Sequence, residues 1–426
     1  MNRSIFLSLI VYGLLFTALI TLHGELLMLV IPFALYLLIG FLRGPENVQL
    51  EVTRHLSAER VTPDSNVDVK VTIVNRGNSL EEVLFEDGVP PRLIVRDGSP
   101  RSLLTLPRGA THTLAYAVSG PRGGYAFESL KVRANDHFAV INREVRVEAQ
   151  NQLFVFPPLT RLRHITIRPR RTRVYAGNIP ARAGGTGTEF FGVRGYQPGD
   201  SPRVINWHVS ARHAEQLFSN EFQQERVSDV GIVLDGRLRT NLFGHGYSLF
   251  DYSVQAAAAL ADAFLSQGNR VGLLLYGKYL GWTYPDYGKV QRERLLQALA
   301  RAQPGDSQIF TALEYIPTRL FPPESQIVVV SPLIEEDVLP LIRLRAFGYQ
   351  VMAISPNPIS FELTFLPRDS TTDLAARVVR MEHALILQKL QRAGVQILDW
   401  HVEQPFDLAV QEKLSRPPIW LRAIGR

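Results

Sequence analysis

Five short, nearly continuous apolar runs in the second half of the chain restrict its fold more than any other feature. Strands that are covered on both faces have this composition, as in parallel sheets, and stretches of helical spacing separate the runs. We therefore predict an α/β doubly wound domain over residues 230–426, with ligand sites beyond the carboxyl ends of its strands. The runs are Val230–Leu234, Val271–Tyr276, Ile327–Val330, Val351–Ile354 and Val395–Leu398.

Two longer apolar runs, Ile5–Leu22 and Leu26–Leu42, lie near the start of the chain. Each is close to the ~20 residues that cross a bilayer, and only a short polar turn separates them. This pattern favours a transmembrane helical hairpin over residues 1–43. A cleaved signal peptide is the alternative, but a second apolar run follows the first, and no small-residue cleavage site precedes a polar segment.

The charges beside these two runs predict an orientation. Arg3 precedes the first run and Arg43 follows the second, while the turn between them carries only His23 and Glu25 as charged or titratable residues. By the positive-inside rule both ends lie in the cytoplasm. The expected location is the cell membrane, with two helices in the lipid bilayer and the remaining domains in the cytoplasm.

Residues 48–155 alternate between apolar and polar side chains, as half-buried strands do. Val67–Ile73 is the longest such stretch, and Asn75–Asn78 and Asp87-Gly88 are turn signals between stretches. Roughly seven short strands in about a hundred residues are typical of a β-sandwich of immunoglobulin-like size. We predict this domain between the hairpin and the α/β domain.

Residues 156–188 are rich in proline, glycine and arginine and are predicted to form a basic linker. One interpretation is a solvated connector, and the other is contact with anionic lipid or with acidic groups of a partner. The cluster Gly184–Gly187 lacks a following Lys-Ser/Thr pair, which disfavours a phosphate-binding loop.

The composition limits the chemistry. The chain of 426 residues has no cysteine, which excludes disulfides and cysteine-bound metal. Its net charge of +6 favours anionic partners without specifying one, and nothing in the pattern indicates nucleic acid. No small-molecule substrate or cofactor is expected.

Residues 189–229 have neither a strand period nor a long helical stripe, and they mix opposite charges with large aromatic side chains. Charged groups beside aromatic rings must be paired or hydrogen-bonded, because burying one alone costs several kcal/mol. Gln197–Asp200 contains the proline and glycine of a turn, and helical spacing begins near Asn206. We expect Arg194, Asp200, Arg203, Trp207 and Arg212 to form one ordered, largely paired unit.

This stretch resembles the signature of the domain of unknown function 58 family. The matching positions are Glu189-Phe190, Arg194, Tyr196, Pro198-Gly199-Asp200, Arg203, Ile205-Asn206-Trp207, Ser210-Ala211-Arg212, Glu221-Phe222 and Glu225-Arg226. Asn206 departs from the Asp that is more usual there. The resemblance implies a membrane-anchored protein with a von Willebrand factor A-like C-terminal half and a MoxR-type AAA ATPase as its partner.

The same resemblance implies a metal site that has degenerated. Its first element would be Asp-x-Ser-x-Ser, but here Asp235 is followed by Arg237 and Arg239, and the later aspartate position is Pro332. Hard divalent cations need oxygen ligands, and added positive charge repels them. We predict that no metal binds there.

Two functions remain open after these observations. The first is an interaction or adaptor protein that works with a MoxR-type AAA ATPase in the assembly or maturation of protein complexes. Its contacts would come from the aromatic and arginine-rich signature stretch or from exposed arginines at Arg237 and Arg239. The second is an enzyme that acts on an envelope polymer through the signature carboxylates. Because no nucleophile or metal set is recognisable, we predict no catalytic residues and favour the first function. The candidate carboxylates are Glu189, Asp200, Glu221 and Glu225.

Overall fold

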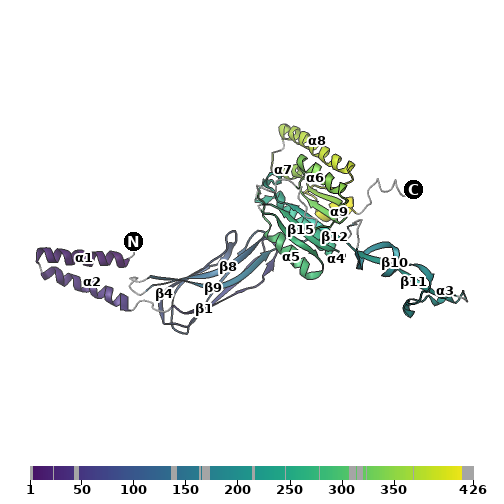
Figure 1. Cartoon of the computed structure of the whole chain (residues 1–426). Helices are drawn as coiled ribbons and strands as arrows, with labels where there is room; N and C mark the ends of the chain where they lie inside the picture. The colour runs from purple at the N-terminus through teal and green to yellow at the C-terminus, as the bar shows by residue number, and fades with distance from the viewer. Residues whose placement is uncertain are drawn as a thin grey trace. The chain divides into compact units, whose positions relative to one another are not determined.

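The computed structural model describes residues 3–22, 24–42, 48–135, 142–162, 165, 173–213, 216–244, 246–277, 279–306, 313, 320–322, 324–367 and 369–414 (Figure 1). Within these ranges the side chains of residues 3–5, 39–42, 142, 173–189, 191 and 222–227 are not described. The chain divides into two compact units, Met1–Phe156 and Pro157–Arg426.

The first unit begins with two contacting helices, α1 (Arg3–Thr21) and α2 (Gly24–Leu42). No helix in the described residues is long and apolar enough to cross a membrane. The hydroxyls of Thr17 and Thr21 donate to backbone carbonyls within α1, and Pro32 lies inside α2, where it supplies no backbone N–H. The predicted transmembrane hairpin is therefore wrong. The hairpin in the predicted fold class and the predicted two-helix location in the cell membrane are wrong with it, and the cytoplasmic placement of the other domains, which was inferred from the hairpin, loses its basis.

The rest of the first unit is a β-sandwich of a four-stranded and a five-stranded sheet. Val67, Val69, Val71 and Ile73 alternate with polar residues along one strand and point into a common core. Each such side chain contributes about 1.5–3 kcal/mol relative to an exposed one. In spatial order the strands are β1 (Leu50–Leu56), β3 (Val67–Asn75), β7 (Thr111–Ser119) and β5 (Ile94–Gly98), then β2 (Arg60–Val61), β9 (Asn142–Val155), β8 (Gly123–Asn135), β4 (Leu80–Asp87) and β6 (Arg101–Leu106).

A buried ion pair joins the two sheets of the sandwich. Arg54 of β1 donates from Nε to Oδ2 of Asp87 at 3.1 Å and from Nη2 to Oδ1, and both side chains are fully buried. The hydroxyl of Tyr116 donates to the same Oδ2 at 2.5 Å, and the ring of Phe127 lies 5.1 Å from the guanidinium carbon. Burial and the neighbouring Asp87 charge raise the pKa of Tyr116, which keeps its proton available to Asp87.

The second unit contains a six-stranded sheet that is parallel except for one edge strand. Counted in chain order, its strands lie in the spatial order 3-2-1-4-5-6 of a doubly wound sheet, so the order reverses between β12 and β17. In spatial order they are β16 (Gly281–Asp286), β15 (Arg270–Tyr276), β12 (Asp229–Asp235), β17 (Gln326–Val330), β18 (Gln350–Pro356) and β19 (Gln396–Trp400).

Helices cover both faces of this sheet (Figure 1). One group contains α4 (Leu249–Ser266) and α5 (Gly288–Arg301), which contact each other, and the other contains α6 (Glu335–Ala346) and α8 (Ser370–Arg392). A capping box of Ser248 and Asp251 starts α4. The remaining elements are α7 (Pro358–Glu362), α9 (Phe406–Leu414), η2 (Leu238–Thr240), β13 (Phe243–Gly244) and β14 (Tyr247–Ser248).

The second unit also contains a separate two-stranded antiparallel sheet, which we call the arm. Its strands are β10 (Arg173–Gly195) and β11 (Phe218–Val227), paired from Arg173 with Val227 to Gly195 with Phe218. β10 thus begins inside the stretch expected to be a linker, of which residues 163–164 and 166–172 lie outside the described part. The arm tip, residues 194–221, connects the two strands and contains η1 (Pro202–Val204) and α3 (Trp207–Ser210).

Candidate functional site

Asp200 is the centre of the hydrogen bonds that shape the arm tip. Its Oδ1 accepts from Nη2 of Arg194 at 2.7 Å, and its Oδ2 accepts from the Gln197 amide at 3.0 Å and from Oγ of Ser219 at 3.2 Å. Gly199, with φ +106°, supplies the backbone conformation that the turn requires. The bonds from Arg194 and Gln197 lower the pKa of Asp200 to about 2, so this carboxyl acts as a structural acceptor.

Asn206 holds α3 against β11. Its Oδ1 caps the helix by accepting from the Val209 amide at 3.0 Å, and its Nδ2 donates to Oδ1 of Asn220 at 2.7 Å. An aspartate could provide the first bond but not the second, because it has no N–H group. Ser210 adds a bond, since its Oγ accepts from the Phe218 amide at 2.9 Å. The asparagine at this position therefore suits the local structure.

The arm tip combines some of the expected site residues and leaves others on the surface. Arg194 pairs with Asp200 and lies 3.7 Å from Oε1 of Glu221, measured from Nε, and the Tyr196 hydroxyl donates to the Asp200 carbonyl at 3.3 Å. Arg203, Trp207 and Arg212 do not join this group. They are exposed, and Nη2 of Arg212 lies 3.2 Å from Nε2 of His208.

Several apolar side chains of the arm are exposed as well. Trp207 is 65% exposed and Phe190 61%, while Leu217 and Val193 are exposed to 43% and 37%. The side chains of Glu189 and Glu225, two of the candidate carboxylates, lie outside those that the structure describes. The tip thus presents a tryptophan and arginines on a backbone fixed by Asp200 and Asn206.

A second cluster lies at the carboxyl ends of β12 and β17, where the strand order reverses. We call Asp235, Arg237, Ser331 and Asp337 the Arg237 centre. Arg237 donates to Asp235 through Nε at 2.8 Å and Nη2 at 2.7 Å, and its Nη2 also donates to Oδ2 of Asp337 at 2.9 Å. The hydroxyl of Ser331 donates to Oδ2 of Asp235 at 2.7 Å. All four residues are buried.

The Arg237 centre does not fit a divalent cation. The guanidinium already lies between the two carboxylates, and both oxygens of Asp235 accept its N–H groups. Oδ1 of Asp337 is buried with no hydrogen-bond partner in the described residues, and burial raises the pKa of Asp337. Across the described part of the chain, no group of three or more acidic or histidine side chains could hold a metal ion.

The structure corrects one expectation about this cluster and adds a residue to it. Arg237 was expected to be exposed beside Arg239, but it is 2% exposed, and only Arg239 reaches the surface. Pro332 has no side-chain oxygen that could bind a metal ion, and its carbonyl accepts a hydrogen bond from Oγ of Ser355 at 3.1 Å. The second carboxylate comes instead from Asp337. The acidic first turn of α6 was the signal that could have identified it.

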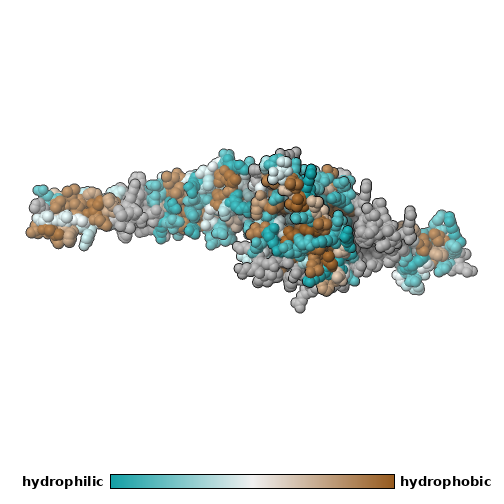
Figure 2. All heavy atoms as spheres, turned by 90° about the horizontal axis from the view of Figure 1, so that it is seen from above, coloured by the Kyte–Doolittle hydropathy of each residue, from teal (hydrophilic) through white to brown (hydrophobic). Residues whose placement is uncertain are grey.

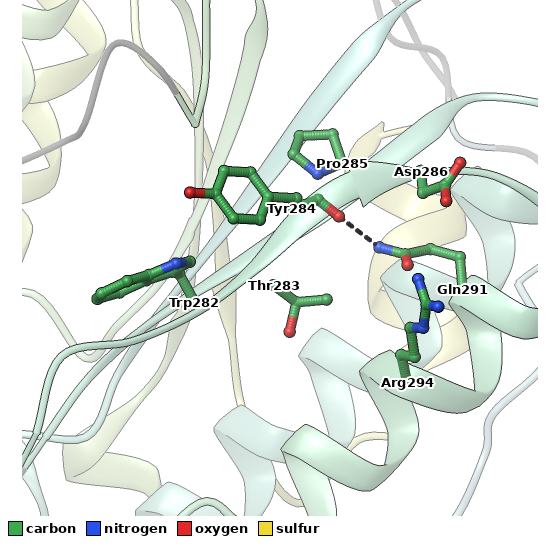
Figure 3. Close-up of a pocket in the computed structure, with 7 residues that line it drawn as sticks. All are labelled: Trp282, Thr283, Tyr284, Pro285, Asp286, Gln291 and Arg294. Atoms are coloured by element: carbon green, nitrogen blue, oxygen red, sulfur yellow. Dashed lines mark hydrogen bonds between the residues drawn. The ribbon is translucent and has the colours of Figure 1, made fainter.

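A pocket that contains none of the predicted site residues lies between β16 and α5. It has a volume of about 400 Å³ and is lined by exposed Trp282 and Tyr284 together with Arg294 (Figure 3). Nε2 of Gln291 donates to the carbonyls of Tyr284 at 2.8 Å and Val271 at 2.7 Å, which ties the edge strand to the helix. Aromatic residues at alternate positions of β16 were the signal in the sequence.

The fold and these sites define an α/β protein with a two-stranded arm and an internal guanidinium at its switch point. Residues 192–364, which contain the arm tip, the Arg237 centre and the pocket, match the family model described as "Protein of unknown function DUF58". Among curated proteins, the chain is similar to the uncharacterized protein YeaD of Bacillus subtilis (strain 168), with 26% identity over 253 residues. That match covers 58% of this chain and 61% of the relative.

Two similar solved structures each cover about a quarter of the chain. The CARDB domain of the PF1109 protein from Pyrococcus furiosus has 14% identity and a TM-score of 0.20, covering 26% of this chain and 90% of that domain. The cupredoxin domain of amoB from Nitrosocaldus yellowstonii has 8% identity and a TM-score of 0.19, covering 25% of this chain and 86% of that domain. Similarities this low carry no conclusion about function.

Proposed function

We propose that this chain is an interaction or adaptor protein that docks a partner protein through the arm tip. The observation that carries the proposal is Trp207, 65% exposed on a helix whose position is fixed by hydrogen bonds. Tryptophan and arginine dominate the energetics of protein interfaces when a rigid scaffold presents them. Because the backbone that carries Trp207 is already ordered, binding there requires no further ordering of the backbone.

The charges around Trp207 favour an acidic partner. Arg203, His208 and Arg212 are all exposed and close to Trp207 in the sequence. The two arginines are positively charged at neutral pH. The resemblance of the signature stretch to its family points to a MoxR-type AAA ATPase as the partner. Because attraction between opposite charges accelerates association and is screened by salt, the association rate should fall as ionic strength rises.

The alternative, an enzyme acting on an envelope polymer, has less support. Asp200 and Glu221 share one partner, Arg194, and a carboxyl with a pKa of about 2 is ionised at neutral pH. Such a group has no proton to donate to a leaving group, whereas hydrolysis of a glycosidic bond requires one carboxylic acid that does. The hydrogen bonds of Asp200 account for its presence without catalysis.

The test is capture of an ATPase from the lysate of the cell that makes the protein. The full chain is compared with the variant Trp207→Ala/Arg203→Glu/Arg212→Glu and with the control Phe347→Ala/Arg343→Glu, which changes an exposed aromatic directly after α6 and an exposed arginine on α6. We expect an AAA ATPase, identified by mass spectrometry, with the wild type and the control but not with the arm-tip variant. Equal recovery with all three proteins would contradict the docking site.

A further inference from the structure

Helix α8 carries two separate apolar faces. Ala376, His383, Leu387 and Leu390 are buried against the α/β domain. On the opposite side, Leu374, Val378, Met381 and Leu385 are exposed to 64%, 46%, 62% and 56%. Figure 2 looks down on the side of the domain where α8 lies in Figure 1, and apolar residues are visible there among hydrophilic ones. α8 lies outside the residues that match the family model.

The exposed residues have the spacing of a coiled-coil seam. They are four, three and four positions apart, which places Leu374 and Met381 at d positions and Val378 and Leu385 at a positions of a heptad repeat. The buried Ala376, the first residue of the inner face, then falls at f, on the far side of the helix from the seam. Within parallel coiled coils, a β-branched residue at a with leucine at d, as Val378 and Leu374 provide here, favours two helices over larger bundles.

The charges beside the seam match a second copy of the same helix. Arg377 occupies a g position and Glu382 the following e position. In a parallel pair, g of one helix faces the next e of its partner, so Arg377 meets Glu382 of the other copy twice by symmetry. In an antiparallel pair, e faces e and g faces g, and the two charges would lie on opposite sides of the seam.

We propose that α8 pairs in parallel with α8 of a second copy of this chain. The pairing covers Leu374, Val378, Met381 and Leu385 and closes with two Arg377–Glu382 ion pairs. Since the domain already holds α8 as a helix, association carries no cost of helix nucleation. Four apolar layers form a small interface, of the size found in weak and reversible complexes. The dimer is independent of the arm tip and of any partner bound there.

The absence of cysteine from the chain allows a clean geometric test. Residues at a positions face each other in a parallel pair, so Val378→Cys should form a disulfide-linked dimer of the full chain under mild oxidation. The control is Val290→Cys, which places a thiol at a similarly exposed valine on α5. No excess of cross-linked dimer at position 378 over position 290 would overturn the proposal.

Charge reversal tests the register without a cross-link. The oligomeric state is measured by sedimentation velocity up to about 100 µM, a concentration at which weak interfaces associate. Arg377→Glu and Glu382→Arg should each weaken dimerisation by about tenfold, because two attractive pairs become repulsive. The double variant should restore it. A monomeric wild type, or a double variant no tighter than the singles, would contradict the proposal.

Discussion

The guanidinium of Arg237 donates two hydrogen bonds to the carboxylate of Asp235, at 2.8 Å from Nε and 2.7 Å from Nη2. The two residues are separated in sequence by Gly236 alone and lie at the switch point of the sheet, where doubly wound proteins commonly place ligands. A third group, the carboxylate of Asp337, accepts from the same Nη2 at 2.9 Å. The positive charge at this position is thus the guanidinium group of Arg237 itself.

Removing that cation should destabilise the α/β domain strongly. Arg237→Ala leaves Asp235 and Asp337 buried without a counter-charge, and breaking a buried pair in this way costs about 3–5 kcal/mol. The loss is measured as the free energy of unfolding in urea. Arg239→Ala, at the exposed neighbouring position, should cost no more than about 1 kcal/mol. Similar losses for the two variants would contradict the pairing.

The same centre predicts how the protein responds to divalent cations. In thermal denaturation of the wild type, Mn²⁺ should leave the melting temperature unchanged, because Arg237 occupies the space between the carboxylates. Arg237→Ser replaces the guanidinium with a hydroxyl oxygen and should gain a saturable stabilisation by Mn²⁺. A saturable stabilisation of the wild type that Asp235→Asn abolishes would show that the centre does bind metal.

Asp200 predicts a pH dependence at the arm tip. Its pKa of about 2 lies below the ordinary value of 3.8, so its contribution to stability is complete above pH 4 and is lost as the pH falls through 2. Carbon NMR of the carboxyl group should report this pKa directly. Arg194→Gln should move it upward, since Arg194 supplies the largest part of the shift. An ordinary pKa in the wild type would disprove the arrangement.

The ion pair of the β-sandwich predicts that two tyrosine hydroxyl groups contribute differently to stability. Tyr116→Phe removes a donor to the buried, charged Asp87 and should cost about 1.5–3 kcal/mol of unfolding free energy. Tyr125→Phe removes a bond to the neutral carbonyl of Pro121 and should cost about 0.5–1.5 kcal/mol. Both losses of unfolding free energy are measured by urea denaturation of the full chain, monitored with a spectroscopic probe in the first unit. A larger loss for Tyr125→Phe would contradict this account of Asp87.

The apolar runs in the sequence located β12, β15, β17, β18 and β19, because covering both faces of a strand leaves it almost wholly apolar. The edge strand β16 has no such run, since its aromatic side chains face solvent. β10 was not predicted from the sequence, because it contains Pro180 and Gly184 and both residue types are rare inside strands.

The Arg237 centre could not be assembled from sequence. Asp337 lies 100 positions after Arg237, and only the strand order brings the first turn of α6 to the end of β12. From the sequence, the positive charge of Arg237 was expected only to repel a metal ion. In the structure, the carboxylates of Asp235 and Asp337 accept its hydrogen bonds. At the arm tip, the turn at Asp200 was readable from Pro198 and Gly199, whereas the exposure of Trp207 was not.

The most direct test of the arm tip as a docking surface is photo-cross-linking in living cells. A photoreactive residue replaces His208, which is exposed beside Trp207, and in a second strain it replaces Phe347, which is exposed directly after α6. After irradiation, mass spectrometry identifies the covalently attached proteins. We expect an AAA ATPase subunit attached at position 208 and absent at position 347. Attachment of the ATPase at position 347 alone, or of no ATPase at either position, would contradict the proposed function.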